Sequence, residues 1–375
     1  MNESNLEGII REEIRTAGPI TFARFMELAL YHPEYGYYGS GRANIGKRGD
    51  FYTNSHATAI YGRMVAEVAL ALSCSTGNGC TFVEMGAGEG YFASDFLDHL
   101  GRYHKGHGIR YIIIENSPGM EAKQRERLGE HAKGINWYKA LEEMPEPIDG
   151  IFFSNELLDA FPFHMVKQEK DVLKEVYISL HRGQLTKELG YLSTGLIPRY
   201  YNRLQLMLEP GMTTEVNLNS LDWVRSVSQK LRKGYVITVD YGYPAREYYS
   251  PSRLNGTFLC YHEHKTLEDP LLHIGEQDIT SHVDFTSVSM VGKNEGLQTL
   301  LFTYQSPFLI AAATLLEAAL ADADQAEMAA VAAGIRNLIH PELLGGTFMV
   351  LVQGKGVAAD GTLLDGIRDY SDRLL

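Results

Sequence analysis

Basic residues and cysteines are both scarce in this chain. Its 375 residues include 34 Lys and Arg against 47 Asp and Glu, which gives a net charge of −13. Nucleic-acid binding needs a basic surface that neutralises phosphates, so we expect no nucleic-acid partner. The three cysteines, Cys74, Cys80 and Cys260, contain no C-x-x-C pair and leave an odd count. This pattern indicates reduced thiols and not a disulfide framework.

Long hydrophobic runs are also missing. The first seven residues are acidic and lack both the apolar core of a signal peptide and the Arg-rich pattern of a transit peptide. The longest apolar stretch, 308–321, is interrupted by Thr314 and Glu317. It is shorter than the about 20 residues that cross a bilayer. We therefore expect a cytoplasmic, bacterial-type protein without membrane insertion.

Apolar periodicity predicts an α/β fold. Helices are expected at 5–17, 21–31 and 56–73, and strands near 81–86, 110–115, 135–138, 149–155 and 234–241. The alternation after residue 81 indicates a parallel sheet with helices on both faces. A helix at 283–295, a strand at 298–304, one long helix at 307–339 and a strand at 347–354 would complete a doubly wound, seven-stranded, Rossmann-like sheet.

The interval between the fourth and fifth of these strands is too long for one crossover helix. Its pattern predicts a hairpin that turns at Arg182-Gly183, and a helix near 220–231. We interpret it as an inserted substrate cap. The predicted organisation is an N-terminal helical extension with a cofactor-covering loop at 1–75, the first part of the sheet domain at 76–155, the cap at 156–233 and the remainder of the sheet domain at 234–375.

A glycine-rich turn follows the first predicted strand of the sheet. The strand contains the acidic residue Glu84, and Gly86-Ala87-Gly88-Glu89-Gly90 comes directly after it. Glycines let a ligand approach the backbone where a Cβ would collide. A dinucleotide fingerprint would need glycine at position 91, which is Tyr91. G-x-G-x-G after an acid is the form seen in S-adenosylmethionine (SAM) methyltransferases. A dinucleotide site and a merely structural turn are the alternatives.

A second carboxylate supports a nucleoside ligand. Glu115 ends the strand of residues 111–115, where the acid of a doubly wound fold accepts the ribose hydroxyls. Trp137, at the end of the third strand, either flanks adenine or belongs to the core. The candidate cofactor-binding residues are Glu84, Gly86, Ala87, Gly88, Gly90, Glu115, Trp137, Asn155, Asp50 and Thr53. Asp50 and Thr53 belong to a polar loop before the sheet, where turn formation and helix capping are the alternative roles.

The fourth predicted strand ends in a polar cluster. Ser154, Asn155 and Glu156 are followed by Asp159, and the carboxyl ends of strands are where open α/β sheets bind ligands. Glu156 and Asp159 share a face if the segment is helical, and two carboxylates can hold a planar guanidinium. They are the candidate catalytic residues. The alternative is that Glu156 caps a helix and Asp159 pairs with a surface base.

The remaining motifs give little or no support for another kind of site. Residues 41–47 nearly match a phosphate loop, but Arg48 replaces the required Ser or Thr. The run His262-Glu263-His264 lacks metal-ligand spacing, so we predict no metal site. No G-x-S-x-G nucleophile elbow occurs in the sequence. The polar run 275–282 either lines a substrate channel or caps a helix.

Several segments in order resemble the MidA-like methyltransferases, the family that includes the mitochondrial complex I assembly methyltransferase. The matching motifs lie at 32–38, 49–53, 83–90, 155–162, 239–242 and 275–280. The resemblance implies a SAM-dependent methyltransferase fold with an inserted cap. It also implies methylation of arginine in a protein or peptide substrate, such as a respiratory complex subunit. A small-molecule O- or N-methyltransferase and a SAM-binding assembly factor with little catalysis remain alternatives.

Overall fold

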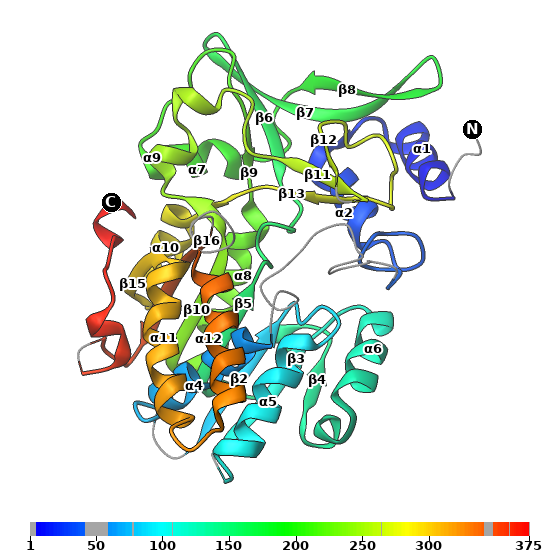
Figure 1. The fold of residues 1–375 in the computed structure, drawn as a ribbon. Helices are drawn as coiled ribbons and strands as arrows, with labels where there is room; N and C mark the ends of the chain where they lie inside the picture. The colour runs from blue at the N-terminus through cyan, green and yellow to red at the C-terminus, as the bar shows by residue number, and fades with distance from the viewer. Residues whose placement is uncertain are drawn as a thin grey trace.

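The computed structural model describes residues 5–41, 59–76, 79–106, 108–263, 265–340, 348–359 and 361–374. A central sheet runs through the molecule in the strand order β15-β16-β10-β5-β2-β3-β4 (Figure 1). Its strands are β2 (Cys80–Met85), β3 (Ile109–Ile114), β4 (Asn136–Tyr138), β5 (Ile148–Asn155), β10 (Leu231–Tyr243), β15 (Gln298–Tyr304) and β16 (Phe348–Lys355). The two-residue strand β14 (Val283–Asp284) pairs with the end of β10 as an eighth member. All seven strands expected from the sequence are present, and β16 is antiparallel to both of its neighbours.

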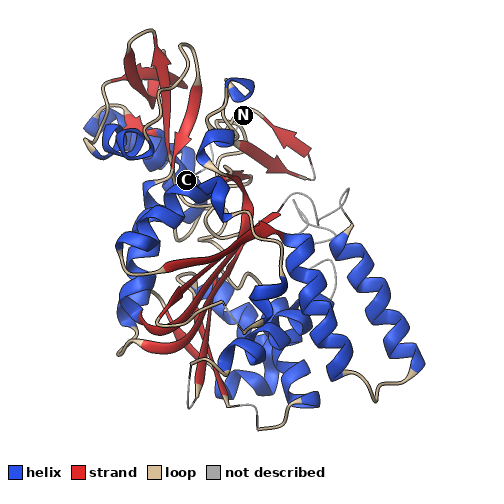
Figure 2. Ribbon diagram, turned by 90° about the vertical axis from the view of Figure 1, so that its left-hand side faces the viewer, coloured by secondary structure: helices blue, strands red, loops and turns tan. Residues whose placement is uncertain are grey.

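Helices cover both faces of this sheet, as Figure 2 shows. One face packs against α4 (Ile60–Ser73), α5 (Tyr91–Tyr103), α11 (Gln305–Ala319) and α12 (Gln325–Ile339). The other packs against α7 (Leu196–Leu204), α8 (Leu218–Lys230), α9 (Ala245–Tyr248) and α10 (Phe285–Asn294). Neighbouring β5 residues show why both faces are needed, because Phe152 packs into one core and Phe153 into the other. One more helix, α6 (Pro118–Leu128), contacts α5.

The single long helix expected at 307–339 is wrong. The structure has two helices, α11 and α12, and the second begins after Asp324. The Asp324 side chain accepts a hydrogen bond of 2.8 Å from the backbone N–H of Glu327. This is an N-cap, which satisfies a donor that the first turn of a helix leaves free. The alanine-rich composition concealed this start signal.

Two smaller sheets and the N-terminal helices gather at one end of the central sheet (Figure 1). The five-stranded sheet contains β1 (Ile20–Thr21), β6 (His164–Glu169), β7 (Val172–His181), β8 (Gln184–Gly190) and β9 (Thr213–Val216). The three-stranded sheet contains β11 (Leu259–His262), β12 (Lys265–Leu267) and β13 (Asp278–Thr280). Helices α1 (Asn5–Ala17) and α2 (Phe22–Tyr31) share a third core with them. The β7–β8 hairpin turns at Arg182-Gly183, as expected, with positive φ at both residues.

Short 3-10 helices complete the described chain: η1 (Gly129–Gly134), η2 (Leu141–Glu143), η3 (Pro251–Arg253), η5 (Leu363–Gly366) and η6 (Ser371–Leu374). No helix within the described residues combines the length and apolarity needed to cross a membrane.

Candidate active site

A cavity of about 1350 Å³ lies at the carboxyl ends of the central strands. The loops after β2, β3, β5 and β10 line it, and so do α2 and the residues around β11 and β13. This edge is where open α/β sheets bind their ligands. The volume exceeds the about 300–1,000 Å³ of ordinary small-molecule pockets. There is room for a nucleoside cofactor and a second molecule together.

The glycine-rich turn borders this cavity. Gly86, Gly88 and Gly90 have φ values of 73°, 51° and 84°, in the left-handed region that favours glycine. Gly86, Ala87 and Gly88 line the cavity. A Cβ on Gly86 would lie 3.0 Å from Leu157 Cδ1, and one on Gly90 would lie 3.3 Å from Gln124 Cα. Backbone conformation therefore favours glycine at all three positions, and close packing adds to this at Gly86 and Gly90.

Gln124 on α6 joins three predicted cofactor residues, and the sequence reasoning missed it. Its fully buried amide nitrogen donates to Gly88 O and to Glu115 Oε2, both at 2.9 Å. Its amide oxygen accepts from Trp137 Nε1 at 3.0 Å. The other carboxylate oxygen of Glu115 accepts from Ser117 N at 2.8 Å. These hydrogen bonds hold Glu115, which lines the cavity, in one orientation. The only sequence signal for the role of Gln124 was an uncharged glutamine within the charged helix α6.

The two acids of the cofactor side are both protonated more readily than usual. Burial raises the pKa of Glu84 to about 8, although the hydrogen bond of 2.7 Å that it accepts from Tyr111 opposes the rise. Burial also raises the pKa of Glu115, against its hydrogen bonds from Ser117 and Gln124. Both side chains border the cavity.

Three of the predicted cofactor residues are not among the described residues that line the cavity. One is Trp137; the Arg125 guanidinium lies 3.9 Å from its ring centre on one face. Its adenine contact stays a prediction. Asp50 and Thr53 lie outside the described residues.

The predicted catalytic segment follows β5 directly. Residues 156–163 form no helix, so Glu156 caps none and the shared helical face with Asp159 is absent. Glu156 adopts φ 53°, which is uncommon for a residue other than glycine and marks functional sites. Asn155 donates to Glu156 Oε1 at 2.9 Å and accepts from the Tyr61 hydroxyl at 2.7 Å. Glu156, Asn155 and Asp159 all line the cavity.

Asp240, at the end of β10, holds this segment in place. Its Oδ2 accepts from the backbone N–H groups of Leu157, Leu158 and Asp159 at 3.2, 3.0 and 3.4 Å, and its Oδ1 accepts from Tyr241 N at 2.9 Å. Burial, followed by the charge of Glu156, raises the pKa of Asp240 to about 8. The sequence offered one signal, an acid at the end of an otherwise apolar strand.

Asp159 is 6% exposed, and among the described residues it forms no ion pair with a base. Its Oδ1 is buried without a hydrogen-bond partner within the described part of the chain. Burial, then the charges of Asp240 and Asp278, raise the pKa of Asp159 well above its ordinary value. An unpartnered buried carboxylate oxygen at a cavity wall is a binding position for a donor that a ligand brings.

The polar run 275–282 contributes to the same cavity. Asp278, Thr280, Ser281 and His282 line it, which favours the channel interpretation. Asp278 accepts from the Tyr38 hydroxyl at 2.8 Å, and Ser281 N donates to Asp159 O at 3.0 Å. Burial lowers the pKa of His282 to about 4.

Comparison with known proteins identifies the family. Residues 61–303, more than half of the chain, match the model of Methyltransf_28, an S-adenosyl-L-methionine-dependent methyltransferase family. This chain belongs to that family. The methyltransferase is also similar to two proteins named "Protein arginine methyltransferase NDUFAF7 homolog, mitochondrial". The relative from Caenorhabditis elegans is 28% identical, with 78% of this chain and 72% of the relative covered. The relative from Drosophila melanogaster is 26% identical, with 93% and 85% covered.

Solved structures agree with the fold and with the cofactor. A COG1565 superfamily member from Burkholderia thailandensis bound to S-adenosyl-homocysteine is 29% identical, with a TM-score of 0.87 and coverage of 99% of this chain and 96% of that one. A second structure of a COG1565 protein from the same organism is 30% identical, with a TM-score of 0.84 and the same coverage.

The residues of this methyltransferase fit SAM. The glycine turn would hold the methionine and ribose portions, and Glu115, which lines the cavity, would accept from the ribose hydroxyls. SAM is the cofactor, and it supplies a methyl group activated by a sulfonium.

Proposed function

We propose that this methyltransferase transfers the methyl group to a guanidinium nitrogen of an arginine side chain in a protein substrate. The observation that carries the proposal is the group of carboxyl side chains that line the cavity beside the glycine turn. Asp159 has an unpartnered buried oxygen there, and Glu156 is held in a strained conformation. The names of the curated relatives support it, since both are called protein arginine methyltransferases.

The abundance of acidic side chains in the cavity lining favours a guanidinium acceptor. Nine of its described lining residues are Asp or Glu, and three are Lys or Arg. Two of the bases are already paired, Arg24 with Glu13 and Glu27, and Arg373 with Glu247. A guanidinium brings five N–H donors and no acceptor, so carboxylates are its natural partners.

The roles of the two acids follow from their positions. Glu156 would hold two guanidinium N–H groups and orient the third nitrogen toward the methyl group. The transfer would form a C–N bond while the S–CH3 bond of the sulfonium breaks, so that S-adenosyl-homocysteine leaves and the acceptor nitrogen then releases one proton. Asp159 would accept that proton through its free Oδ1, because the arriving cation lowers the pKa that burial has raised.

A paired-peptide assay tests the proposal. Two peptide pools, identical except that one has Arg and the other Lys at the central position, are incubated with methyl-labelled SAM. We expect label in the Arg pool, and a fall of about 100-fold or more for Glu156→Gln. The SAM dissociation constant, measured by calorimetry, should stay within about two-fold, since the substitution keeps the shape of a side chain that follows β5 and accepts from Asn155, whereas the glycine turn follows β2.

The matched control is Glu142→Gln. Glu142 is an exposed carboxylate at the rim of the same cavity, so the substitution removes the same charge without touching the segment after β5. Its activity should equal that of the unaltered protein. Equal labelling of both pools, or full activity of Glu156→Gln, would contradict an arginine acceptor. Labelling of small amines alone would favour a small-molecule methyltransferase.

A further inference from the structure

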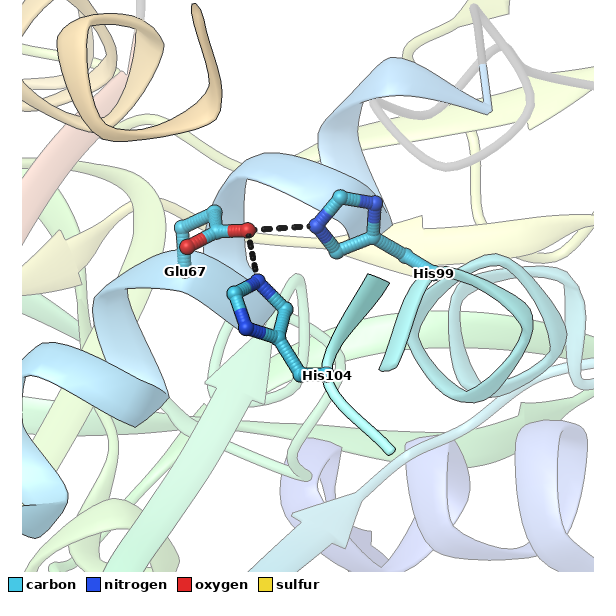
Figure 3. A group of neighbouring side chains, drawn as sticks. All are labelled: Glu67, His99 and His104. Atoms are coloured by element: carbon cyan, nitrogen blue, oxygen red, sulfur yellow. Dashed lines mark hydrogen bonds and ion pairs between the residues drawn. The ribbon is translucent and has the colours of Figure 1, made fainter. Parts of the chain in front are cut away.

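Three potential metal ligands converge on the helix layer of the central sheet, outside the cavity. Glu67 lies on α4, His99 lies on α5, and His104 is the C-cap residue that directly follows α5. Figure 3 shows the two imidazole rings pointing at the same carboxylate. Glu67 Oε1 is 2.5 Å from His99 Nε2 and 2.7 Å from His104 Nε2. None of the three lines the cavity, so the methyl-transfer chemistry does not account for them.

The ligand types and their spacing suit zinc. Two imidazole nitrogens and one carboxylate oxygen form a His₂Glu set, and the three ligand atoms lie within 4.8 Å of one another. Zn–N and Zn–O bonds of about 2.0–2.1 Å place the ligands of a tetrahedral ion about 3.3 Å apart. The observed N···O distances must therefore widen by less than about 1 Å, which small side-chain rotations can supply.

The position of His104 makes such rotations and metal entry feasible. Its side chain is 30% exposed, whereas those of Glu67 and His99 are 7% and 0% exposed. It lies where the chain leaves the helix, at φ −130°. An ion can enter past this ring, and a water molecule can fill the fourth ligand position from the same side.

We propose that Glu67, His99 and His104 form a zinc site that joins α4 to α5. This proposal departs from the sequence expectation of no metal site. The expectation rested on local spacing, whereas Glu67 is 32 residues from His99 and 37 from His104. Among the described residues, this is the group that meets the distance requirement for a metal.

The surroundings of His99 bear on the affinity of the site for zinc. Metal-bound histidines usually donate their second ring N–H to an acceptor, and loss of that support costs about 10–100-fold in affinity. His99 Nδ1 is buried and has no hydrogen-bond partner in the described chain. We therefore expect zinc to bind about 10–100-fold more weakly than at a fully supported structural zinc site. A hydrogen-bonded His–Glu–His cluster that takes up no ion is the competing explanation.

Calorimetric titration of the chelator-treated full-length protein with Zn²⁺ distinguishes the two explanations. We expect one equivalent to bind and the melting temperature to rise by about 2–5 °C at saturation. His104→Gln should weaken binding by about 100-fold or more and abolish the rise. This ring is partly exposed, so the variant should fold, which its melting temperature without metal checks.

His131→Gln is the matched control. His131 Nε2 lies 2.7 Å from Asp98 Oδ1, so it forms the same type of pair without a third ligand. Zinc binding should be unchanged in this variant. Co²⁺ in place of Zn²⁺ should give the intense visible absorption of a four-coordinate site, again lost in His104→Gln. No stoichiometric binding to the unaltered protein, or binding that survives His104→Gln, would overturn the proposal. Neither result bears on the arginine proposal, because the three residues lie outside the cavity.

Discussion

Two loops at the same edge of the central sheet are each held by one buried side chain, yet they differ in what they leave open. On the cofactor side, Gln124 bonds to Gly88, Glu115 and Trp137, and its amide has no donor left over. On the acceptor side, Asp240 holds the backbone of residues 157–159. There Asp159 Oδ1 remains without a partner in the described chain.

The difference matches the two kinds of ligand. A cofactor is the same molecule in every turnover, so a completed hydrogen-bond network can preorganise its site. An acceptor must enter and leave, and a site with unfilled hydrogen-bond capacity gives it something to bind. Backbone strain differs between the two sides in the same way. Among the described non-glycine residues with positive φ, the one that lines the cavity is Glu156, on the acceptor side.

The largest expected effect comes from removing the anchor of the acceptor side. Asp240→Ala leaves the backbone N–H groups of four residues without their acceptor, so we expect a loss of about 3–5 kcal/mol in the free energy of unfolding. Methyl transfer should fall by about 100-fold or more, because the segment carrying Glu156 and Asp159 loses its position. Denaturant unfolding and the labelled-methyl assay measure the two effects.

Asp149→Ala is the control for this variant. Asp149 lies at the opposite end of β5 and forms an exposed ion pair with Arg232 on β10, with two contacts of 2.9 Å. Exposed pairs contribute about 0–1 kcal/mol, so stability should change little and methyl transfer should not change. If Asp240→Ala behaved like Asp149→Ala, the anchoring role would be wrong.

Glu84 makes the cofactor side sensitive to pH. Its pKa in the folded protein is about 8, above the ordinary value of 4.5, so the folded state binds a proton more tightly than the unfolded chain. This stabilisation is complete below about pH 4.5 and is lost as the pH rises through about 8. From pH 6 to pH 9 we expect a loss of about 2–3 kcal/mol from this group.

Thermal or denaturant unfolding across that pH range checks this effect. Glu84→Gln should flatten the curve by that amount, since the amide oxygen still accepts from Tyr111 and does not titrate. Glu146→Gln, at an exposed position, should keep the original slope. An unchanged slope in Glu84→Gln would mean that Glu84 is ionised in the folded protein.

Gln124→Leu should separate the two sides. It removes three hydrogen bonds from the cofactor network, so we expect SAM to bind about 10–100-fold more weakly. Turnover at saturating SAM should fall by less than about three-fold, because the acceptor loop is untouched. Glu126→Ala, on the exposed face of the same helix, is the control. A large fall in turnover at saturating SAM, with unchanged SAM affinity, would show that Gln124 supports the acceptor loop and not the cofactor network.

The sequence predicted what depends on local pattern. Strand positions followed from apolar runs, and the G-x-G-x-G turn followed from the need for positive φ at Gly86, Gly88 and Gly90. The break between α11 and α12 was missed although Asp324 and Glu327 carry a capping signal, because alanines on both sides favour helix. After β5, the shared face considered for Glu156 and Asp159 depended on a helix, and the structure instead has a non-helical segment whose backbone N–H groups donate to Asp240.

The hydrogen-bond partners of Gln124 and Asp240 could not be assigned from the sequence for a physical reason. Each acts on residues distant in the chain, Gln124 on Gly88 and Asp240 on residues 157–159. Their partners are defined only when the sheet brings the ends of separate strands together. The same holds for Glu67, His99 and His104, which join two helices and share no sequence motif.

The smallest effect concerns the boundary between the two sides. Asn155 was predicted to bind the cofactor, but its amide donates to Glu156 and its oxygen accepts from Tyr61. Tyr61→Phe removes one hydrogen bond, so we expect turnover to fall by about 3–10-fold, equivalent to about 1 kcal/mol. SAM affinity should stay within about two-fold if Asn155 acts through Glu156. Weaker SAM binding with unchanged turnover would instead assign Asn155 to the cofactor side, and the acceptor side would then begin at Glu156.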